Sequence, residues 1–339
     1  MLCYLFLIVL LFIFSIIILF IYFLTSHYES FQSNAKRFNY YTLQNFTKMT
    51  QEIYKIPKKF MYKFPANKKN IPRGYFVDMN PILKNTFPNI PIAFKLGDVT
   101  TCQPFPVIQK TRPSLDRLPK NCKSILLRLN SGRHFQNIKI HPIRLDTFLK
   151  KKSIILWRGS STGPFQTMTP PLATRAYFVL NYFNKYPFLD IGISNICQDP
   201  LPDYHIFRKR GLTRKEHEQY KYIVSIQGND VASNLKWLLA SSSLIFMCKP
   251  TVASWFMEDT LIPFKHYILL RDDFSDIEQK FLWAENNPEK CITIIENAHR
   301  FVSPFLNIKN EKFLMTQVVQ WYKDNIKYIN AHGTVIIQR

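Results

Sequence analysis

The sequence lacks the short motifs that mark several common catalytic and metal-binding classes. It contains no Asp-x-Asp pair, no Walker loop and no G-x-S-x-G elbow, so a P-loop kinase or a serine hydrolase has little support. No group of histidines and cysteines has the spacing of a zinc site. No zinc-finger, helix-turn-helix or RNA-binding signature is present, so nucleic acid is not an expected partner.

Glycine and acidic residues are scarce, whereas basic residues are abundant. The 339 residues include 9 glycines, and 45 Lys and Arg stand against 23 Asp and Glu, for a net charge of +22. A solvated basic surface is the simplest explanation. A membrane leaflet rich in anionic lipid explains a basic segment beside a membrane better than nucleic acid does. A phosphorylated glycolipid acceptor and a nucleotide donor would also suit a positive cleft.

The first residues differ in composition from the rest. Residues 2–24 contain no charge and no proline and are mostly Leu, Ile and Phe. At a rise of about 1.5 Å per residue they would extend about 34 Å, enough to cross a hydrocarbon core of about 30 Å. The basic start and the small-residue cleavage site of a signal peptide are missing. We therefore expect a single-pass transmembrane anchor at residues 1–26, followed by a basic stem at residues 27–74.

The charges and cysteines around the anchor predict its orientation. No Lys or Arg precedes the apolar run, whereas Lys36 and Arg37 follow it, which favours a cytoplasmic body by the positive-inside rule. Cys3 lies in the run, and the other five cysteines are scattered and odd in number, which favours a reducing compartment. The sequon Asn45-Phe46-Thr47 favours a secretory compartment. We expect a single-pass membrane protein with a cytoplasmic body.

The remaining chain has the alternating pattern of an α/β protein. A proline-rich first part has strands at 91–96 and 124–129. From residue 153 the alternation becomes regular and predicts a parallel sheet. Its expected strands are residues 154–157, 188–194, 222–226, 244–247 and 267–270. The expected helices are residues 172–183, a short helix after a Thr213/Glu216 capping box, a helix from Val231, residues 253–261 and residues 311–329.

Residues 220–237 are central to the expected organisation of the chain. An apolar strand ends in a turn that contains Gly228, and Leu235, Leu238 and Leu239 would share one face of the following helix. A turn that opens a helix presents free N–H groups and the positive end of the helix dipole to one point. Gly228 would let the backbone approach a phosphate closely. The alternative is an ordinary βα unit of a parallel sheet.

This region resembles glycosyltransferase family 90. The resemblance rests on GNDVASNLKW at 228–237, SSSLIFM and SWFMEDTLIPFKHYILL after it, and LWRGSS at 156–161. It covers roughly residues 90–302 and is closest to bacterial lipopolysaccharide-core glycosyltransferases, with protein O-glucosyltransferases as relatives. It implies two Rossmann-like domains facing across a cleft, the GT-B arrangement. We expect an acceptor-side domain at 75–152, a domain for the donor nucleotide at 153–310 and a C-terminal helix and tail at 311–339.

The resemblance also implies roles for individual residues. Asp98 takes the place of the catalytic aspartate, although it could merely cap the turn after Gly97. Arg158 and Arg175 would contact the leaving phosphate, and Glu258 would accept hydrogen bonds from a ribose or lie on a helix surface. The donor-side candidates are Arg158, Gly159, Ser160, Arg175, Gly228, Asn229, Asp230, Val231, Ala232, Ser233, Asn234, Lys236 and Glu258, and the acceptor-side candidates are Lys110, Arg112, Arg133 and His134.

The sequence therefore predicts an inverting glycosyltransferase that moves a hexose from a nucleotide sugar, most simply a UDP-sugar, to a lipopolysaccharide or related glycan. Its only co-substrate would be the nucleotide sugar. Without an acidic pair to hold a metal ion, we expect a metal-independent reaction. Two alternatives stay open: a protein O-glycosyltransferase of a secretory compartment, and a non-catalytic membrane-tethered relative that binds glycan or nucleotide. Retention of Asp98 together with Arg158 argues against the non-catalytic relative.

Overall fold

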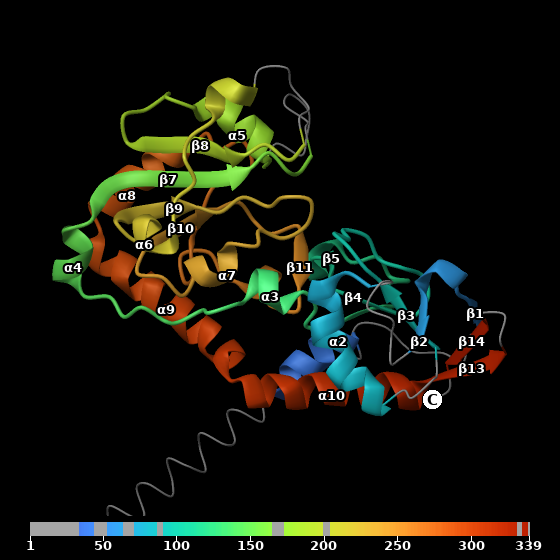
Figure 1. Cartoon of the computed structure of the whole chain (residues 1–339). Coiled ribbons are helices and arrows are strands. Elements are labelled where there is room, and N and C mark those ends of the chain that lie inside the picture. Colours follow the sequence, from blue (N-terminus) through green and yellow to red (C-terminus); the bar gives the residue numbers. More distant parts are fainter. Residues whose placement is uncertain are drawn as a thin grey trace, which may run out of the picture.

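The computed structural model describes residues 34–43, 53–63, 71–86, 91–164, 173–198, 204–330 and 334–337. The predicted anchor lies outside these residues. None of the helices in these segments combines the length and apolar character that a membrane crossing requires. The described chain is α/β and has two halves, each built on a mainly parallel sheet; they lie left and right in Figure 1.

The larger sheet is the parallel one that the sequence predicts. Its strands are β7 (Lys152–Ser160), β8 (Leu189–Asn195), β9 (Tyr220–Val224), β10 (Leu244–Met247) and β12 (Ile268–Leu269). They lie in the order β12-β10-β9-β7-β8, and every neighbouring pair is parallel. The chain reverses its direction of travel across the sheet between β7 and β9. In such doubly wound sheets, ligands bind beyond the carboxyl ends of the strands at this point of reversal.

Side chains alternate across this sheet and build two cores. On β9, Tyr222 and Val224 belong to one apolar cluster and Ile223 to the other. The helices of this half are α4 (Leu145–Leu149), α5 (Arg175–Tyr182), α6 (Arg214–His217), α7 (Leu235–Leu238), α8 (Ile277–Glu285) and α9 (Pro288–Leu306). Helix α5 packs on one face and α7 on the other, while α9 contributes to both clusters. The capping box predicted at Thr213 and Glu216 is confirmed at the start of α6.

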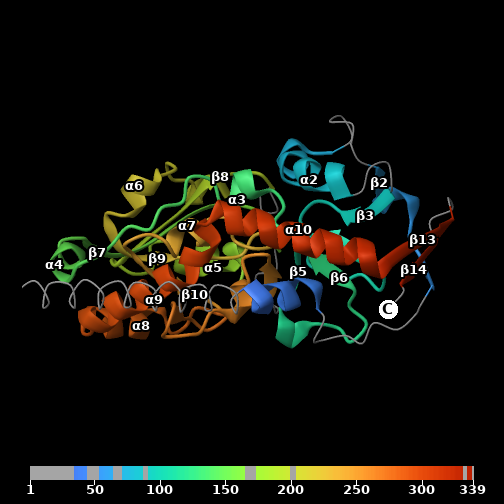
Figure 2. The ribbon, with the colours of Figure 1, turned by 90° about the horizontal axis from the view of Figure 1, so that it is seen from below.

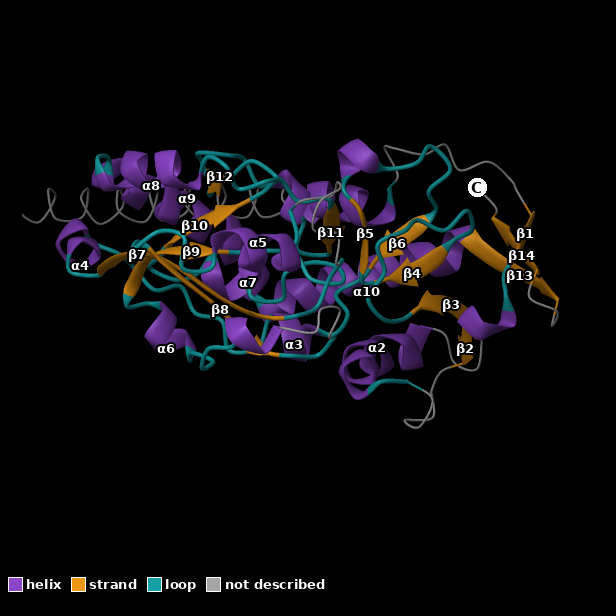
Figure 3. Ribbon diagram, turned by 90° about the horizontal axis from the view of Figure 1, so that it is seen from above, coloured by secondary structure: helices purple, strands orange, loops and turns teal. Residues whose placement is uncertain are grey.

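The smaller half is built on a second sheet of order β2-β3-β4-β6, in which β2 is antiparallel and the other strands are parallel. Its strands are β2 (Met61–Lys63), β3 (Pro91–Lys95), β4 (Val107–Gln109) and β6 (Ser124–Leu126). Strand β5 (Thr111–Pro113) pairs with β11 (Val252–Ser254) and so connects the halves. Strands β1 (Ile53–Lys55), β13 (Ile326–Asn330) and β14 (Thr334–Ile337) form a separate antiparallel sheet. Figure 3 shows the two main sheets side by side.

In the described segments this half carries the helical residues 34–42, α2 (Arg73–Thr86), α3 (Ser131–His134) and α10 (Ile308–Asn325). Helix α10 runs past α2 and the helical residues 34–42 (Figure 2). One apolar cluster extends from Ile223 of the larger sheet through Trp255 to Phe94 of the smaller sheet and Val318 of α10. The described halves therefore share a core. The GT-B arrangement across a cleft stays a prediction.

Several predicted elements differ in the structure. The helix expected from Val231 is limited to the single turn α7, so the stretch after Gly228 presents no long helix and no strong helix dipole. The helix expected at 253–261 is instead β11 followed by a short 3-10 turn at Glu258–Thr260. Strand β7 continues through Ser160, so Arg158 lies within a strand rather than in a loop after it. Short-range periodicity cannot distinguish these cases, because burial by the rest of the fold decides them.

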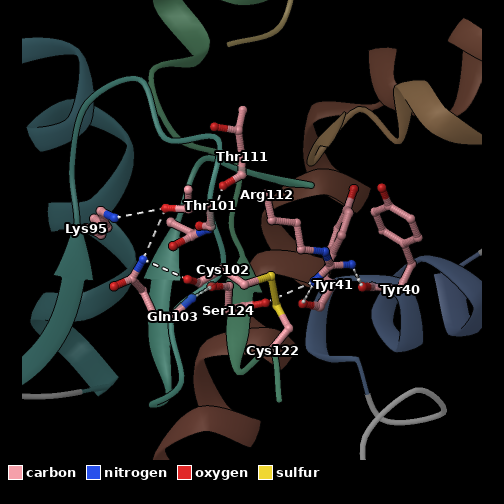
Figure 4. Close-up of a disulfide and its surroundings, with 11 residues drawn as sticks. Tyr40, Tyr41, Lys95, Thr101, Cys102, Gln103, Thr111, Arg112, Cys122 and Ser124 are labelled. Atoms are coloured by element: carbon pink, nitrogen blue, oxygen red, sulfur yellow. Dashed lines mark hydrogen bonds between the residues drawn. A yellow bond between two sulfur atoms is a disulfide. The ribbon is translucent and has the colours of Figure 1, made fainter. Parts of the chain in front are cut away.

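Residues 34–43, which we expected to be part of a stem, pack into the body instead. Tyr41 is fully buried, and its hydroxyl donates a hydrogen bond to the carbonyl oxygen of Trp255. The guanidinium of Arg112 donates to the carbonyls of Tyr40 and Tyr41 at the end of this helix, and to the carbonyl of Ser124 at 3.0 Å (Figure 4). Arg112 is therefore a structural residue that holds the helix end, and not the acceptor-side residue that we expected.

A disulfide joins Cys102, in the loop after β3, to Cys122, just before β6 (Figure 4). Closing a loop of this length stabilises the fold by about 3 kcal/mol, because it restricts the unfolded chain. Protein disulfides persist mainly in oxidising compartments. The cysteines therefore do not support the reducing compartment that we expected from their scattered positions. The cytoplasmic orientation now depends on the charges around the anchor alone and stays a prediction.

We predict that Arg112→Met destabilises the protein by about 3 kcal/mol, because it leaves buried carbonyl oxygens without a donor. Urea unfolding followed by circular dichroism would measure the free energy of unfolding. Arg144→Met is the matched control, because the Arg144 side chain is 83% exposed, and it should change stability by less than about 0.5 kcal/mol. Equal stability of the two variants would contradict the structural role of Arg112.

Candidate functional site

The loop after β3 and the loop after β9 meet at a buried lysine. The ammonium of Lys110 lies 2.9 Å from Oδ1 of Asp98 and 2.6 Å from Oδ2 of Asp230. Only 1% of the Lys110 side chain is exposed. Burial lowers the pKa of Lys110, but Asp230, Tyr75 and Asp98 raise it by more, so the ammonium stays charged. Lys110 thus joins one carboxylate from each half of the molecule.

Asp98 is the accessible member of this group. About a third of its side chain (32%) is exposed, and its Oδ2 accepts a long hydrogen bond of 3.4 Å from Asn229. Burial raises the pKa of Asp98, but Lys110, Asn229 and Arg133 lower it by more, so its pKa lies below the ordinary value. Asp98 is therefore ionised at neutral pH and within reach of a ligand, as a proton acceptor must be.

Asp230 has the opposite environment. Its side chain is 5% exposed, and Thr111 donates a hydrogen bond of 3.3 Å to its Oδ2. Burial raises the pKa of Asp230, although Lys110 opposes that effect. Asp230 therefore acts as an internal partner of Lys110, and its contact with a donor stays a prediction. Across the described segments, no three His, Cys, Asp or Glu side chains lie close enough together to hold a metal ion.

Helix α3 brings Arg133 and His134 to the same place. Nε2 of His134 lies 3.5 Å from the ammonium of Lys110. Burial, together with the charges of Lys236, Lys110 and Arg133, lowers the pKa of His134 strongly, so the imidazole is neutral. Arg133 is exposed. His134 thus lies beside Lys110, and Arg133 is close enough to lower the pKa of Asp98. Their contact with an acceptor stays a prediction.

Arg175 bridges the carboxyl ends of β7 and β9, at the point where the sheet reverses. It donates to the carbonyl and hydroxyl of Ser160 at 3.0 Å, to Thr162 Oγ1 at 2.8 Å, and to the carbonyl of Ile226 at 3.2 Å. Burial lowers its pKa to about 10, so it is still charged at neutral pH. Among the described residues it forms no ion pair with a carboxylate. Its charge is therefore available to an anion.

Gly228 makes room for this arginine. A Cβ atom at position 228 would lie 3.0 Å from Oγ1 of Thr162 and 3.2 Å from Nη2 of Arg175. The next residue, Asn229, accepts a hydrogen bond of 3.0 Å from the backbone N–H of Gly163, whose φ of +116° suits glycine. The sequence predicted that Gly228 lets a phosphate approach the backbone. In the structure, the group that lies against Gly228 is the guanidinium of Arg175.

Sequence reasoning missed three residues that shape the site. Gly163 could have been found as one of few glycines, in a polar stretch after a strand. Tyr75 fixes the Asp98 loop, because its hydroxyl bonds to both the N–H and the carbonyl of Gly97. Asp78 accepts two hydrogen bonds of 2.6 Å from Ser131 and so holds the start of α3. Nothing in the local sequence marks Tyr75 or Asp78.

A small pocket of about 20 Å³ opens beyond the carboxyl ends of β9 and β10. The predicted residues Val231 and Ala232 line it together with Gln227, Met247 and Val252. It has room for roughly one water molecule, so a larger ligand would require these side chains to move. Ser233 and Asn234 follow as half-buried residues, and the Ser225 hydroxyl lies 3.4 Å from Oδ1 of Asn234.

Arg158 does not join this site. Its Nη2 lies 2.9 Å from both carboxylate oxygens of Asp190 on the neighbouring strand β8, and its Nε donates to the carbonyl of Arg210. Only 8% of the side chain is exposed. A Cβ atom at Gly159 would collide with the Trp157 ring, which explains the glycine by packing. The expected role of Arg158 in phosphate binding does not fit this arrangement.

Lys236 and Glu258 form a buried ion pair. The ammonium lies 2.7 Å from Oε1 of Glu258, with 0% and 1% of the two side chains exposed. Glu258 also accepts hydrogen bonds from the backbone N–H and the hydroxyl of Ser254. The carboxylate is therefore occupied by protein donors, although Glu258 also lines the small pocket. The expected contacts of Glu258 with a ribose and of Lys236 with a phosphate stay predictions. Lys236 also affects the site through its field, which lowers the pKa of His134.

Comparison with known proteins identifies the family. A model of Glycosyl transferase family 90 matches residues 148–332. The O-glucosyltransferase LpsA of Dichelobacter nodosus is 34% identical over 259 residues, which cover 76% of this chain and 74% of LpsA. Protein O-glucosyltransferase 2 of Danio rerio is 32% identical over 88 residues, covering 26% of this chain and 17% of that protein. The uncharacterized protein 179R of Invertebrate iridescent virus 6 is 31% identical over 103 residues, covering 28% of this chain and 9% of that protein.

The family match extends over more than half of the chain, and the similarity to LpsA spans most of both proteins. The resemblance predicted from the motifs is thereby confirmed. Membership implies a sugar donor and a glycan acceptor. The chain belongs to glycosyltransferase family 90 and is a glycosyltransferase.

Proposed function

We propose that this protein is an inverting glycosyltransferase in which Asp98 is the base and Arg175 stabilises the leaving phosphate. One observation carries the proposal: consecutive residues connect the two groups. Gly228 packs against the guanidinium of Arg175, and Asn229 bonds to the carboxylate of Asp98. An accessible carboxylate and an unpaired cation thus lie on two sides of one loop, as transfer between an acceptor hydroxyl and a sugar phosphate requires.

The proposed step is a single displacement. Asp98 takes the proton of the acceptor hydroxyl while the hydroxyl oxygen attacks the anomeric carbon of the sugar. The bond from that carbon to the diphosphate breaks, and its electron pair stays on the phosphate oxygen. Arg175 and the exposed Arg133 are the cations available to stabilise the negative charge that develops there. We propose a UDP-hexose as donor, with glucose as the first sugar to test, because LpsA is named an O-glucosyltransferase.

We also propose that the reaction needs no metal ion. The two carboxylates at the site, Asp98 and Asp230, share the ammonium of Lys110. A cation of the protein therefore already occupies the position between them, where a divalent ion would otherwise offset their repulsion. The leaving phosphate would be stabilised by guanidinium groups in place of an ion.

For the acceptor we propose a lipopolysaccharide or related glycan, bound at the side of Asp98 where Arg133 and His134 lie. We also propose that residues 1–26 are a membrane anchor and that the two halves face each other across a cleft. The resemblance of the motifs at 156–161 and 228–237 to bacterial lipopolysaccharide-core glycosyltransferases supports this acceptor class. A protein acceptor is the second candidate. The Cys102–Cys122 disulfide favours it, because it suits a secretory compartment.

We predict that Asp98→Asn lowers the rate of sugar transfer by about 100-fold or more while UDP-sugar still binds, because the proton acceptor is lost but Lys110 keeps Asp230 as a charged partner. Transfer to glycan and protein acceptors would be measured with a panel of nucleotide sugars, and donor binding by calorimetry. The control is Asp116→Asn, at an acid whose side chain is 46% exposed. Transfer by Asp98→Asn at the native rate would place the base elsewhere, and loss of donor binding would make Asp98 structural.

Arg175→Met and Arg158→Met should separate the two arginines. Removing the Arg175 charge should cost about 2–4 kcal/mol in transition-state stabilisation, or roughly 30- to 1000-fold in rate. Arg158→Met should leave the rate of the folded enzyme within about threefold, because Asp190 keeps Lys209 as a partner at 2.9 Å. Single-turnover rates with saturating donor would measure both. The reverse order of effects would return the phosphate contact to Arg158.

Lys110→Met should move the pH profile of kcat/KM. Lys110 lowers the pKa of Asp98, so without it the carboxylate stays protonated to a higher pH and the acid limb of the profile should move to higher pH. Asp98 also contributes stability above its unfolded pKa, and this contribution is lost as pH falls through its lowered folded pKa. Lys139→Met, at an exposed lysine, is the control. An unmoved acid limb would show that Lys110 does not set the ionisation of the base.

A further inference from the structure

Helix α10 has a basic outward face flanked by apolar side chains. Its exposed positions include Lys309, Lys312 and Lys323, while Asp324 is the one acid among them. Ile308 and Phe313 lie at the two edges of this face and are 53% and 57% exposed. The opposite face carries the buried residues Leu314, Val318 and Tyr322. The helix is therefore packed on one side only.

Two apolar grooves run along the sides of α10. One, of about 540 Å³, lies between α10 and residues 34–42 and is lined by Phe38, Phe313 and Trp321. The other, of about 530 Å³, lies between α10 and α2 and is lined by Ile82, Ile308 and Met315, with Val77 59% exposed beside them. The apolar face of α10 is buried in the protein, so only the exposed apolar side chains at its edges are left to enter a membrane interface as those of interfacial helices do.

The chain itself brings this face close to the proposed anchor. The side chains of Asn34 and Asn310 exchange two hydrogen bonds, of 2.7 and 2.9 Å, which tie residue 34 to the first turn of α10. The uncharged stretch at residues 2–24 ends ten residues before Asn34. Ten residues extend over at most about 34 Å. A bilayer that held residues 2–24 would therefore lie within that distance of the start of α10.

We propose that the α10 face, defined as Val77, Ile308, Lys309, Lys312, Phe313 and Lys323, docks on the surface of a bilayer that contains anionic lipid. The apolar side chains enter the boundary between head groups and acyl chains, and the lysines contact lipid phosphates. The proposal rests on the anchor in the proposed function. Docking would hold the body in one orientation at the membrane, whereas an anchor alone would leave it free to turn.

The test uses the full chain in vesicles with a fluorescent bimane label at Phe313→Cys, in a Cys3→Ser, Cys197→Ser background. The free thiols that remain, Cys248 and Cys291, react slowly because burial raises their pKa. The matched position is Leu282→Cys on α8, which is 53% exposed. An interfacial side chain lies about 5–10 Å into the boundary, so lipids brominated near the head group should quench roughly half of the emission at 313 and little at 282. Equal, weak quenching at both positions would overturn the proposal.

Charge reversal supplies the second arm. Lys309→Glu with Lys312→Glu should abolish the quenching at 313 in vesicles that contain phosphatidylserine. Lys150→Glu with Lys215→Glu, at exposed lysines just after α4 and on α6, changes the net charge equally and should leave the quenching intact. Shielding of the label that depends on protein concentration rather than on brominated lipid would show a second copy of the chain on this face and overturn the proposal.

Flotation with the vesicles is scored first in every variant. A chain that does not float contradicts both the anchor and the α10 face. Quenching that follows the prediction in a protein without transferase activity would leave the docking surface in place and reject only the proposed chemistry. None of these readouts depends on a sugar donor, so the two failures are distinguishable.

Discussion

The structure depends on one buried ammonium held between two carboxylates. Lys110 lies between the loop after β3 and the loop after β9, and its partners Asp98 and Asp230 come from different halves of the molecule. A buried charge that loses its partner is strongly destabilising. Keeping Lys110 charged therefore requires both loops to stay where they are. The same requirement places an ionised, accessible carboxylate opposite the carboxyl edge of the larger sheet.

The other buried cations show why charge alone does not identify a site. Arg112 holds the end of a helix, Arg158 pairs with Asp190, and Lys236 pairs with Glu258. Arg158 and Lys236 are each neutralised by a carboxylate, whereas Arg112 bonds to carbonyl oxygens and its buried Nε has no hydrogen-bond partner among the described residues. Arg175 also bonds to neutral oxygens, but it is half-buried and lies at the point where the sheet reverses, so an anion can approach it. The position and exposure of a cation, together with its partners, separate a structural residue from one that can bind an anion.

Membership of glycosyltransferase family 90 and the geometry of the site together restrict the possible reaction. The family implies transfer of a sugar, and the site offers Asp98 as an accessible base and Arg175 as an available cation. The small volume of the neighbouring pocket means that a nucleotide base would enter only after Val231, Met247 or their neighbours move. The disulfide beside the Asp98 loop restrains the smaller half, so the larger half is the better place for such movement.

Features that depend only on residues adjacent in the chain could be predicted from the sequence. The alternating apolar strands, the capping box at Thr213, the need for glycine at 228 and the placement of Asp98 after a strand all follow from local patterns. Tertiary structure decided the roles of the charged residues, because their partners are distant in sequence: Arg112 holds Tyr40, 72 positions away, and Lys110 reaches Asp230. It also ended the helix after Gly228 at one turn and paired Cys102 with Cys122. Local propensity sets what a segment can form, and long-range burial and pairing decide which of those forms has the lowest free energy.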